Sequence, residues 1–459
     1  MTQASAPTDP SSQPPLLQQL ASLGLLGSRI PANPGLAELL GNEIDLADSI
    51  ALASTLASLD RARPLGNASL EPPQRQFLNA RGGMLRLIAS SFEPGDTPAT
   101  APQELHDDRQ PIAVSYNPGV SALTVNFNVV EVSWARTPDT GELTGFALSR
   151  SDTLDVAAES IAFQAMPQPL SKKIPFLLDR AGAVAGQTNI AAQDSLVGER
   201  WLLSPTLPKE GEAVLPVKSP ALNAAMIFRR LAADQGIALP LPEPAVAPAQ
   251  GLRLLAEHGS VALDRVAALV LRYSNNLSAE LVGLAATRVI GGPTDDLGRS
   301  GQALAGWLTQ RIPWADWRGF VAANHSGLSS ESRMTPRQAM AILQYAWGVR
   351  GEQFDLYALL APVRWSDDLN EDRGEEETEL AVRAKSGTLW YARALVGYML
   401  TANGRTLGFA LFVSDPAERA ALDARMNVDE LAEVPGARAW MKRAKELEKA
   451  LVTRWAKGY

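Results

Sequence analysis

An Asn-Gly pair at positions 403 and 404 separates two apolar runs, residues 394–400 and 407–413. Asparagine and glycine tolerate the left-handed backbone of a tight turn, so this pattern predicts an antiparallel hairpin. A strand-like run over residues 382–390 precedes the hairpin, and a helix is predicted from about residue 438 to 455. The C-terminal part is therefore expected to be an antiparallel sheet with helices packed on a face. The expected apolar face of the last helix consists of Trp440, Ala444, Leu447 and Leu451.

Upstream of this region the apolar pattern changes its period. Apolar and polar residues alternate over residues 123–129, which predicts a half-buried strand, and the apolar phase then shifts by one residue, which predicts a bulge. Further strand-like runs reach Met166, and an amphipathic helix is predicted over residues 220–237. Helices are also expected over residues 261–271, from 277 to about 291, and from 336 onward.

Composition divides the chain into four parts. Residues 1–16 are rich in Ser, Pro and Gln and are expected to be a disordered leader, without the basic start and apolar core of a signal peptide. Residues 17–110 contain short Ala/Leu-rich helical pieces of unclear role, and residues 111–240 are expected to form a β-rich inserted domain. A proline-rich connector at 240–248 opens the last part, residues 241–459.

The bulk composition excludes several classes of function. A net charge of −8 and a pI near 5.2, without clustered Lys and Arg, argue against nucleic acid as a partner. No apolar run is long enough for a transmembrane helix. The absence of cysteine excludes disulfides and thiolate sites, and three histidines without a metal-binding spacing predict neither a metal nor another cofactor.

Two short segments carry candidate chemistry. Lys385-Ser386-Gly387-Thr388 offers a positive charge, two hydroxyls and a glycine that lets a ligand approach the strand, which suits a peptide's terminal carboxylate. Ser274 and Asn276 form a Ser-x-Asn element before a helix, and the two elements occur together in penicillin-binding proteins and β-lactamases. Structural alternatives remain open, since Ser274 could cap a helix, Asn276 could be a turn residue and Lys385 a surface charge.

The sequence resembles the serine-type D-alanyl-D-alanine carboxypeptidase/endopeptidase family, the low-molecular-weight penicillin-binding proteins that carry inserted domains. The resemblance runs from about residue 116 to the C-terminus. It rests on Tyr116-Asn117-Pro118-Gly119 with Asn126-Phe127-Asn128, Leu215-Pro216-Val217, Tyr273-Ser274-Asn275-Asn276-Leu277 with Ala279-Glu280, Ser326-Gly327-Leu328-Ser329, and Lys385-Ser386-Gly387-Thr388-Leu389. It implies an α+β, penicillin-binding-protein/β-lactamase-like transpeptidase fold with a β-rich insert and an atypical helical N-terminus.

The resemblance also implies a substrate and a role for each site residue. The substrate would be a peptidoglycan stem peptide ending in D-Ala-D-Ala, and the location would be the periplasm. As catalytic residues, Ser274 would relay a proton, Asn276 would hold the substrate amide, and Lys385 would supply positive potential. In the substrate-binding segment, Ser386 stands where threonine is commoner, Gly387 lets the ligand approach, and Thr388 would bind the carboxylate and contribute its N–H to an oxyanion hole.

One element of the family pattern is missing, the Ser-x-x-Lys nucleophile. No lysine in the sequence has a serine three places before it, and the first lysine is Lys172. The nearest echo is Ala53-Ser54-Thr55-Leu56-Ala57, where alanine stands in place of lysine, so the nucleophile is unassigned. His325, where the family usually has a small residue, is expected to be a loop residue and not a member of a catalytic triad.

Three hypotheses account for the missing motif. The chain could be a divergent family member with a replaced N-terminus, or the start of its reading frame could be miscalled and hide an ordinary exported carboxypeptidase. It could also be a non-catalytic protein that binds peptidoglycan peptides. β-Lactams would be ligands that acylate the protein only if a nucleophile exists.

Overall fold

The computed structural model describes residues 109–150, 155–179, 198–242, 262–350, 355–363, 381–431 and 434–459. These residues belong to two compact units, one within 112–261 and one formed by 107–111 with 262–459. The predicted leader, 1–16, and nearly all of the predicted helical segment, 17–110, lie outside the described residues, as does Ser54.

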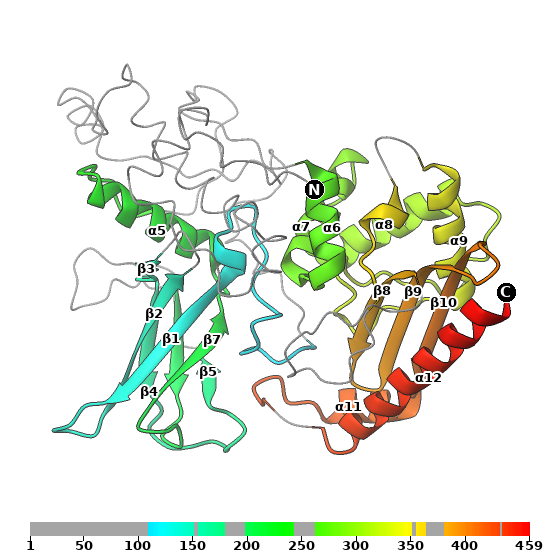
Figure 1. Ribbon diagram of the computed structural model, residues 1–459. Helices are drawn as coiled ribbons and strands as arrows, with labels where there is room; N and C mark the ends of the chain where they lie inside the picture. Colours follow the sequence, from blue (N-terminus) through cyan, green and yellow to red (C-terminus); the bar gives the residue numbers. More distant parts are fainter. Residues whose placement is uncertain are drawn as a thin grey trace, which may run out of the picture. The chain divides into compact units, whose positions relative to one another are not determined.

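In the first unit, the described residues form two small sheets and a helix (Figure 1). One sheet has the strand order β3-β2-β1-β7 and the other β4-β6-β5, with β4 and β6 parallel. Trp201, Leu203 and Leu215 are fully buried between them and form the centre of the core. The strands are β1 (Val129–Arg136), β2 (Leu143–Arg150), β3 (Asp155–Ala157), β4 (Ile161–Ala165), β5 (Phe176–Leu178), β6 (Glu199–Leu203) and β7 (Glu210–Pro216), and the helix is α5 (Pro220–Asp234).

The strand predicted over residues 123–129 is wrong, because β1 begins only at Val129. Residues 126–128 form a 3-10 turn, η3 (Asn126–Asn128), in which all three residues have positive φ. Asparagine tolerates this left-handed backbone, and the Asn128 amide donates to the carbonyl of Gly119 at 2.8 Å. The shift of the apolar phase at residue 130 therefore reflects the start of the strand, and the predicted bulge is also wrong.

The second unit is a three-stranded antiparallel sheet, in the order β10-β9-β8, covered by helices on both faces (Figure 1). On one face Val452 and Ala456 of the last helix pack against Leu395 and Met399 of β9. On the other face Tyr398 packs against Leu343 of α9. Successive side chains of a strand point to opposite faces of the sheet, so alternate residues of β9 contribute to two separate cores.

The elements of this unit agree with the hairpin and the helices predicted from the sequence. The Asn-Gly turn lies between β9 and β10, and Gly404 has a φ of 72°. The strands are β8 (Val382–Leu389), β9 (Ala392–Leu400) and β10 (Thr406–Ser414). The helices are α6 (Leu263–Tyr273), α7 (Asn276–Val289), α8 (Leu297–Arg311), α9 (Pro336–Gly348), α10 (Leu356–Leu359), α11 (Pro416–Arg425) and α12 (Ala437–Gly458).

The apolar face predicted for α12 is partly wrong. Leu447 is 46% exposed, whereas Glu448, the next residue, is fully buried. Besides Ala437 in the first turn, the buried positions are Ala444, Glu448, Val452 and Ala456, which follow one another at a spacing of four. A charged residue therefore occupies a position that periodicity assigns to an apolar one. Among the described helices, none combines the length and apolar character that crossing a bilayer requires.

Candidate active site

Ser274 lies at the junction of α6 and α7, in a backbone conformation that is rare for a residue with a side chain. Its φ and ψ are 55° and 40°, and its N–H donates to the carbonyl of Val270 as the C-cap of α6. Asn275 is the N-cap of α7, since its side chain accepts from the N–H of Ser278 at 2.8 Å. A left-handed serine costs on the order of 1 kcal/mol, and such strain tends to occur at functional sites.

Lys385 of β8 contacts this junction directly. Its Nζ donates to Ser274 Oγ at 2.5 Å, across 111 positions of sequence, and it also donates to the carbonyl of Ser386. Burial and then the nearby charge of Arg393 lower the pKa of Lys385 from its ordinary value. Since the ammonium is partly desolvated, it gains more from an anionic ligand than an exposed lysine would. Lys385 is therefore not an isolated surface charge.

Asn276 and residues 386–388 complete the set of residues singled out from the sequence. Asn276 is the first residue of α7, one position beyond the cap that fixes the start of the helix. Ser386, Gly387 and Thr388 follow Lys385 along β8 and are exposed. The junction and the strand thus bring a hydroxyl, an ammonium and an open strand segment into one unit.

Arg393 and Glu448 belong to the same region, although sequence reasoning missed both. In the register of β8 and β9, Arg393 is directly opposite Thr388, and its Nη1 donates to Thr388 Oγ1 at 2.7 Å. Arg393 Nε donates to Glu448 Oε2, also at 2.7 Å. Burial raises the pKa of Glu448, although the contact with Arg393 opposes this. The sequence signal for Glu448 is that a charged residue occurs at the four-residue spacing of the small and apolar residues Ala444, Val452 and Ala456.

The loop that contains Ser326 and Gly327 is fastened to α7 by a buried carboxylate. Glu280 of α7 accepts the N–H of His325 through Oε2 and the N–H of Ser326 through Oε1, both at 2.9 Å. Because α7 begins at Asn276, this carboxylate joins the loop to the helix that carries a candidate site residue. A carboxylate that accepts two backbone N–H groups is among the stronger hydrogen-bonding arrangements in proteins.

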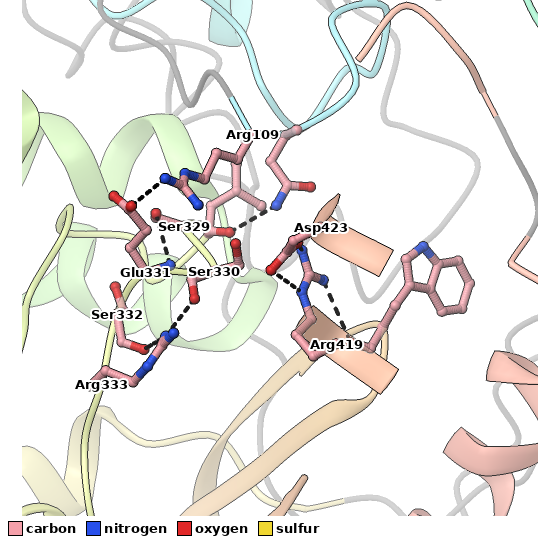
Figure 2. A network of polar contacts seen from close by, with 11 residues as sticks. Arg109, Ser329, Ser330, Glu331, Ser332, Arg333, Arg419 and Asp423 are labelled. Carbon is pink, nitrogen blue, oxygen red and sulfur yellow. Dashed lines mark hydrogen bonds and ion pairs between the residues drawn. The ribbon is translucent and has the colours of Figure 1, made fainter. Parts of the chain in front are cut away.

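The next part of the loop has a second set of polar contacts, shown in Figure 2. Arg109 forms an ion pair with Glu331, and the side chain of Gln110 donates to the carbonyl of Leu328 at 3.0 Å. On α11, Arg419 forms an ion pair with Asp423 and donates to the carbonyl of Trp390, at the turn between β8 and β9. These contacts hold the loop and the β8–β9 turn without using a site residue.

His325 has a structural position in this loop, as the sequence analysis expected. Thr287 Oγ1 donates its proton to the carbonyl of Ser300 and therefore accepts the proton of Ser300 Oγ. Since Ser300 Oγ has donated its only proton, it must accept from His325 Nε2, at 2.8 Å. The ring lies on Gly283 of α7, where an added Cβ would be 2.0 Å from the ring's Cγ. Only glycine leaves room for the imidazole at this position.

Burial lowers the pKa of His325 to about 4. In the unfolded chain the pKa of histidine is about 6.5, so between these values the unfolded state binds more protons. The free energy of unfolding should therefore fall as the pH drops from about 6.5 to about 4, by about 2 kcal/mol after discounting for partial solvent exposure. Urea unfolding at about pH 7 and about pH 4.5 should show this loss in the wild type and a smaller loss in His325→Gln. Equal pH dependence in both proteins would contradict it.

Comparisons with known proteins identify the family and the fold. A family model described as D-Ala-D-Ala carboxypeptidase 3 (S13) matches residues 96–434. Carboxypeptidase Rv3627c of Mycobacterium tuberculosis is 31% identical over 214 residues, 45% of each chain. Carboxypeptidase DacB of Mycolicibacterium smegmatis is 28% identical over 248 residues, 51% of each chain. The chain therefore spans about half the length of the curated relatives it matches.

A solved structure of penicillin binding protein 4 (dacB) from Haemophilus influenzae, complexed with a novel β-lactam, has a similar fold. Its TM-score is 0.50 and its identity 18%, over 76% of this chain and 73% of that chain. The same protein's structure without a named ligand gives a TM-score of 0.50 at 17% identity, over 79% and 73%. The α+β, penicillin-binding-protein-like fold expected from the sequence is confirmed.

Proposed function

The chain belongs to the D-Ala-D-Ala carboxypeptidase 3 (S13) family, and on that premise we propose that it binds peptidoglycan stem peptides ending in D-Ala-D-Ala. The binding site consists of Ser274, Asn276 and residues 385–388. One observation carries the proposal, the hydrogen bond of 2.5 Å between Lys385 Nζ and Ser274 Oγ. Two segments that the sequence keeps far apart thereby contribute to one site, with the residue types that a peptide carboxylate needs.

Each residue has a role that follows from its chemistry. The Lys385 ammonium attracts the terminal carboxylate, and the hydroxyls of Ser386 and Thr388, on the other face of β8, are further donors along the same strand. Among the described residues, a Cβ added at Gly387 would meet only Ala394, at an ordinary contact distance of 3.7 Å, so their packing does not require glycine there. Its lack of a side chain therefore serves the approach of a ligand to β8.

Ser274 and Asn276 act at the scissile amide. A hydroxyl that contacts a lysine can accept a proton from an attacking group and donate it to the leaving amine, which is the relay that a serine peptidase needs. The Asn276 side chain offers an acceptor and a donor to the substrate's amide. In a family of serine-type carboxypeptidases these roles imply a peptidase, whose action would begin with attack by a serine on the carbonyl carbon.

The first step of that reaction has no assigned residue in this chain. The sequence contains no Ser-x-x-Lys motif, so neither the attacking serine nor the lysine that would activate it can be assigned. We therefore propose a D-Ala-D-Ala carboxypeptidase/endopeptidase-type protein whose nucleophile is unassigned, and we expect negligible covalent turnover from this chain. The alternative is a non-catalytic protein that binds the peptide with the site of a peptidase. Because peptidoglycan is outside the cytoplasm, we propose a periplasmic location.

Calorimetric titration with an acylated tripeptide ending in D-Ala-D-Ala tests the proposal. We expect weak binding, with a Kd on the order of 1 mM, and weaker binding of the same peptide ending in L-Ala-L-Ala. Fluorescent penicillin should leave no band that survives denaturing electrophoresis. Lack of preference for the D-peptide would refute the proposed site, and a denaturation-resistant penicillin band would refute the absence of acylation.

A further inference from the structure

We propose that the buried Glu448–Arg393 pair fixes Thr388 as a hydrogen-bond donor and thereby makes the site selective for a ligand that ends in a carboxylate. This inference rests on the proposed function and names two positioning residues for it. Arg393 and Glu448 act through Thr388, which is exposed on β8, so neither needs to touch the ligand.

The direction of the hydrogen bonds carries the first step. A guanidinium can only donate, so the contact of 2.7 Å between Arg393 Nη1 and Thr388 Oγ1 makes the threonine oxygen an acceptor there. The proton of the Thr388 hydroxyl is then available for a second partner. An exposed hydroxyl whose oxygen is already engaged by a cation is a stronger donor, because hydrogen bonds in a chain polarise one another. It suits a carboxylate oxygen, which only accepts.

The burial of Glu448 carries the second step. Its side chain is fully buried, that of Arg393 is 12% exposed, and Arg393 Nε donates to Glu448 Oε2 at 2.7 Å. Oε1 has no hydrogen-bond partner among the described residues. A buried ion pair is weak evidence for stability, since apolar residues of similar volume often serve as well or better. A role in holding the guanidinium against Thr388 accounts for the pair.

The edge of the sheet carries the third step. β8 is an outer strand of its sheet, and residues 361–363 pair with its outer edge at Val382, Arg383 and Ala384. Lys385 and Thr388 follow this paired part of the strand. Lys385 and Thr388 have side chains on opposite faces, because successive residues of a strand alternate. A ligand that lies along the outer edge of β8 can therefore meet Lys385 from one face and Thr388 from the other. Lys385, Arg393 and Glu448 together have a net charge of +1, which favours an anionic end group.

The test compares two peptides that differ only in charge, an acylated D-Ala-D-Ala with a free carboxylate and the same peptide as its carboxamide. Arg393→Met/Glu448→Leu replaces the ion pair by apolar residues, leaves the net charge unchanged and avoids an unpaired buried carboxylate. We expect about tenfold weaker binding of the carboxylate peptide and unchanged binding of the carboxamide, about 1.4 kcal/mol of lost discrimination. Melting temperature shows whether the double variant is folded.

Two further variants keep the interpretation specific. Arg393→Lys should retain part of the preference, because an ammonium can still donate to Thr388. Arg405→Met removes an exposed arginine just before β10 and should leave the preference as in the wild type. A folded double variant that keeps the wild-type preference within about twofold overturns the inference and leaves the proposed function standing. If the wild type itself binds neither peptide, the proposed function fails first.

Discussion

Replacing Lys385 by methionine should weaken binding of a D-Ala-D-Ala-ended peptide by about 30- to 100-fold, equal to about 2–3 kcal/mol. Methionine keeps most of the length of the side chain and removes only the charge and the donors. The loss has two physical sources. The ligand's carboxylate loses an ammonium that is already partly desolvated, and Ser274 Oγ loses the donor that orients it at 2.5 Å.

Calorimetric titration of three variants separates these sources. Lys442→Met, which removes an exposed lysine of α12, has the same change in net charge and should bind like the wild type. Ser274→Ala keeps the ammonium and should weaken binding by only about fivefold, because its hydroxyl serves proton transfer more than affinity. Equal affinity of Lys385→Met and the wild type would contradict both the role of the ammonium and the site built around it.

The site residues that could be predicted from the sequence are those that stand in a recognisable local pattern. Lys385 and Ser274 each stand in a short polar segment beside a strand or helix pattern, and the Asn-Gly turn predicts the hairpin that follows Lys385. Their contact across 111 positions required the resemblance to a family, since neither periodicity nor spacing relates two segments so far apart. Fold class was likewise predictable from the same hairpin and the last helix.

The part that the sequence did not predict depends on exceptions to periodicity. Glu448 occupies a buried position of α12 where an apolar residue is expected, and Leu447 beside it is exposed, so the helix is rotated from its apparent apolar face. Arg393 is one residue before the apolar run 394–400 that predicted this strand, and it could not be paired with Thr388 until the register of β8 and β9 was known. Asn126 and Asn128 imitate strand alternation but adopt positive φ. In each case a tertiary contact outweighed the local pattern.

Glu280→Ala should lower the free energy of unfolding by about 4 kcal/mol, because two backbone N–H groups lose a charged acceptor at once. Glu280 is buried, and its two oxygens accept separately from His325 and Ser326 at 2.9 Å. Glu280→Gln should be almost as damaging. An amide has one oxygen, so its NH₂ group would face one of the two N–H groups, donor against donor.

Urea unfolding and hydrogen exchange of peptides that span residues 324–333 measure this effect. We expect faster exchange at His325 and Ser326 in both variants, since the loop loses its attachment to α7, whereas Glu446→Ala on the exposed face of α12 should change stability by less than about 0.5 kcal/mol. Glu280 attaches the loop to α7, the helix that begins at Asn276. Affinity for the peptide should therefore fall together with the protection of these amides from hydrogen exchange. Wild-type exchange at both amides in a folded Glu280→Ala protein would show that the carboxylate does not hold the loop.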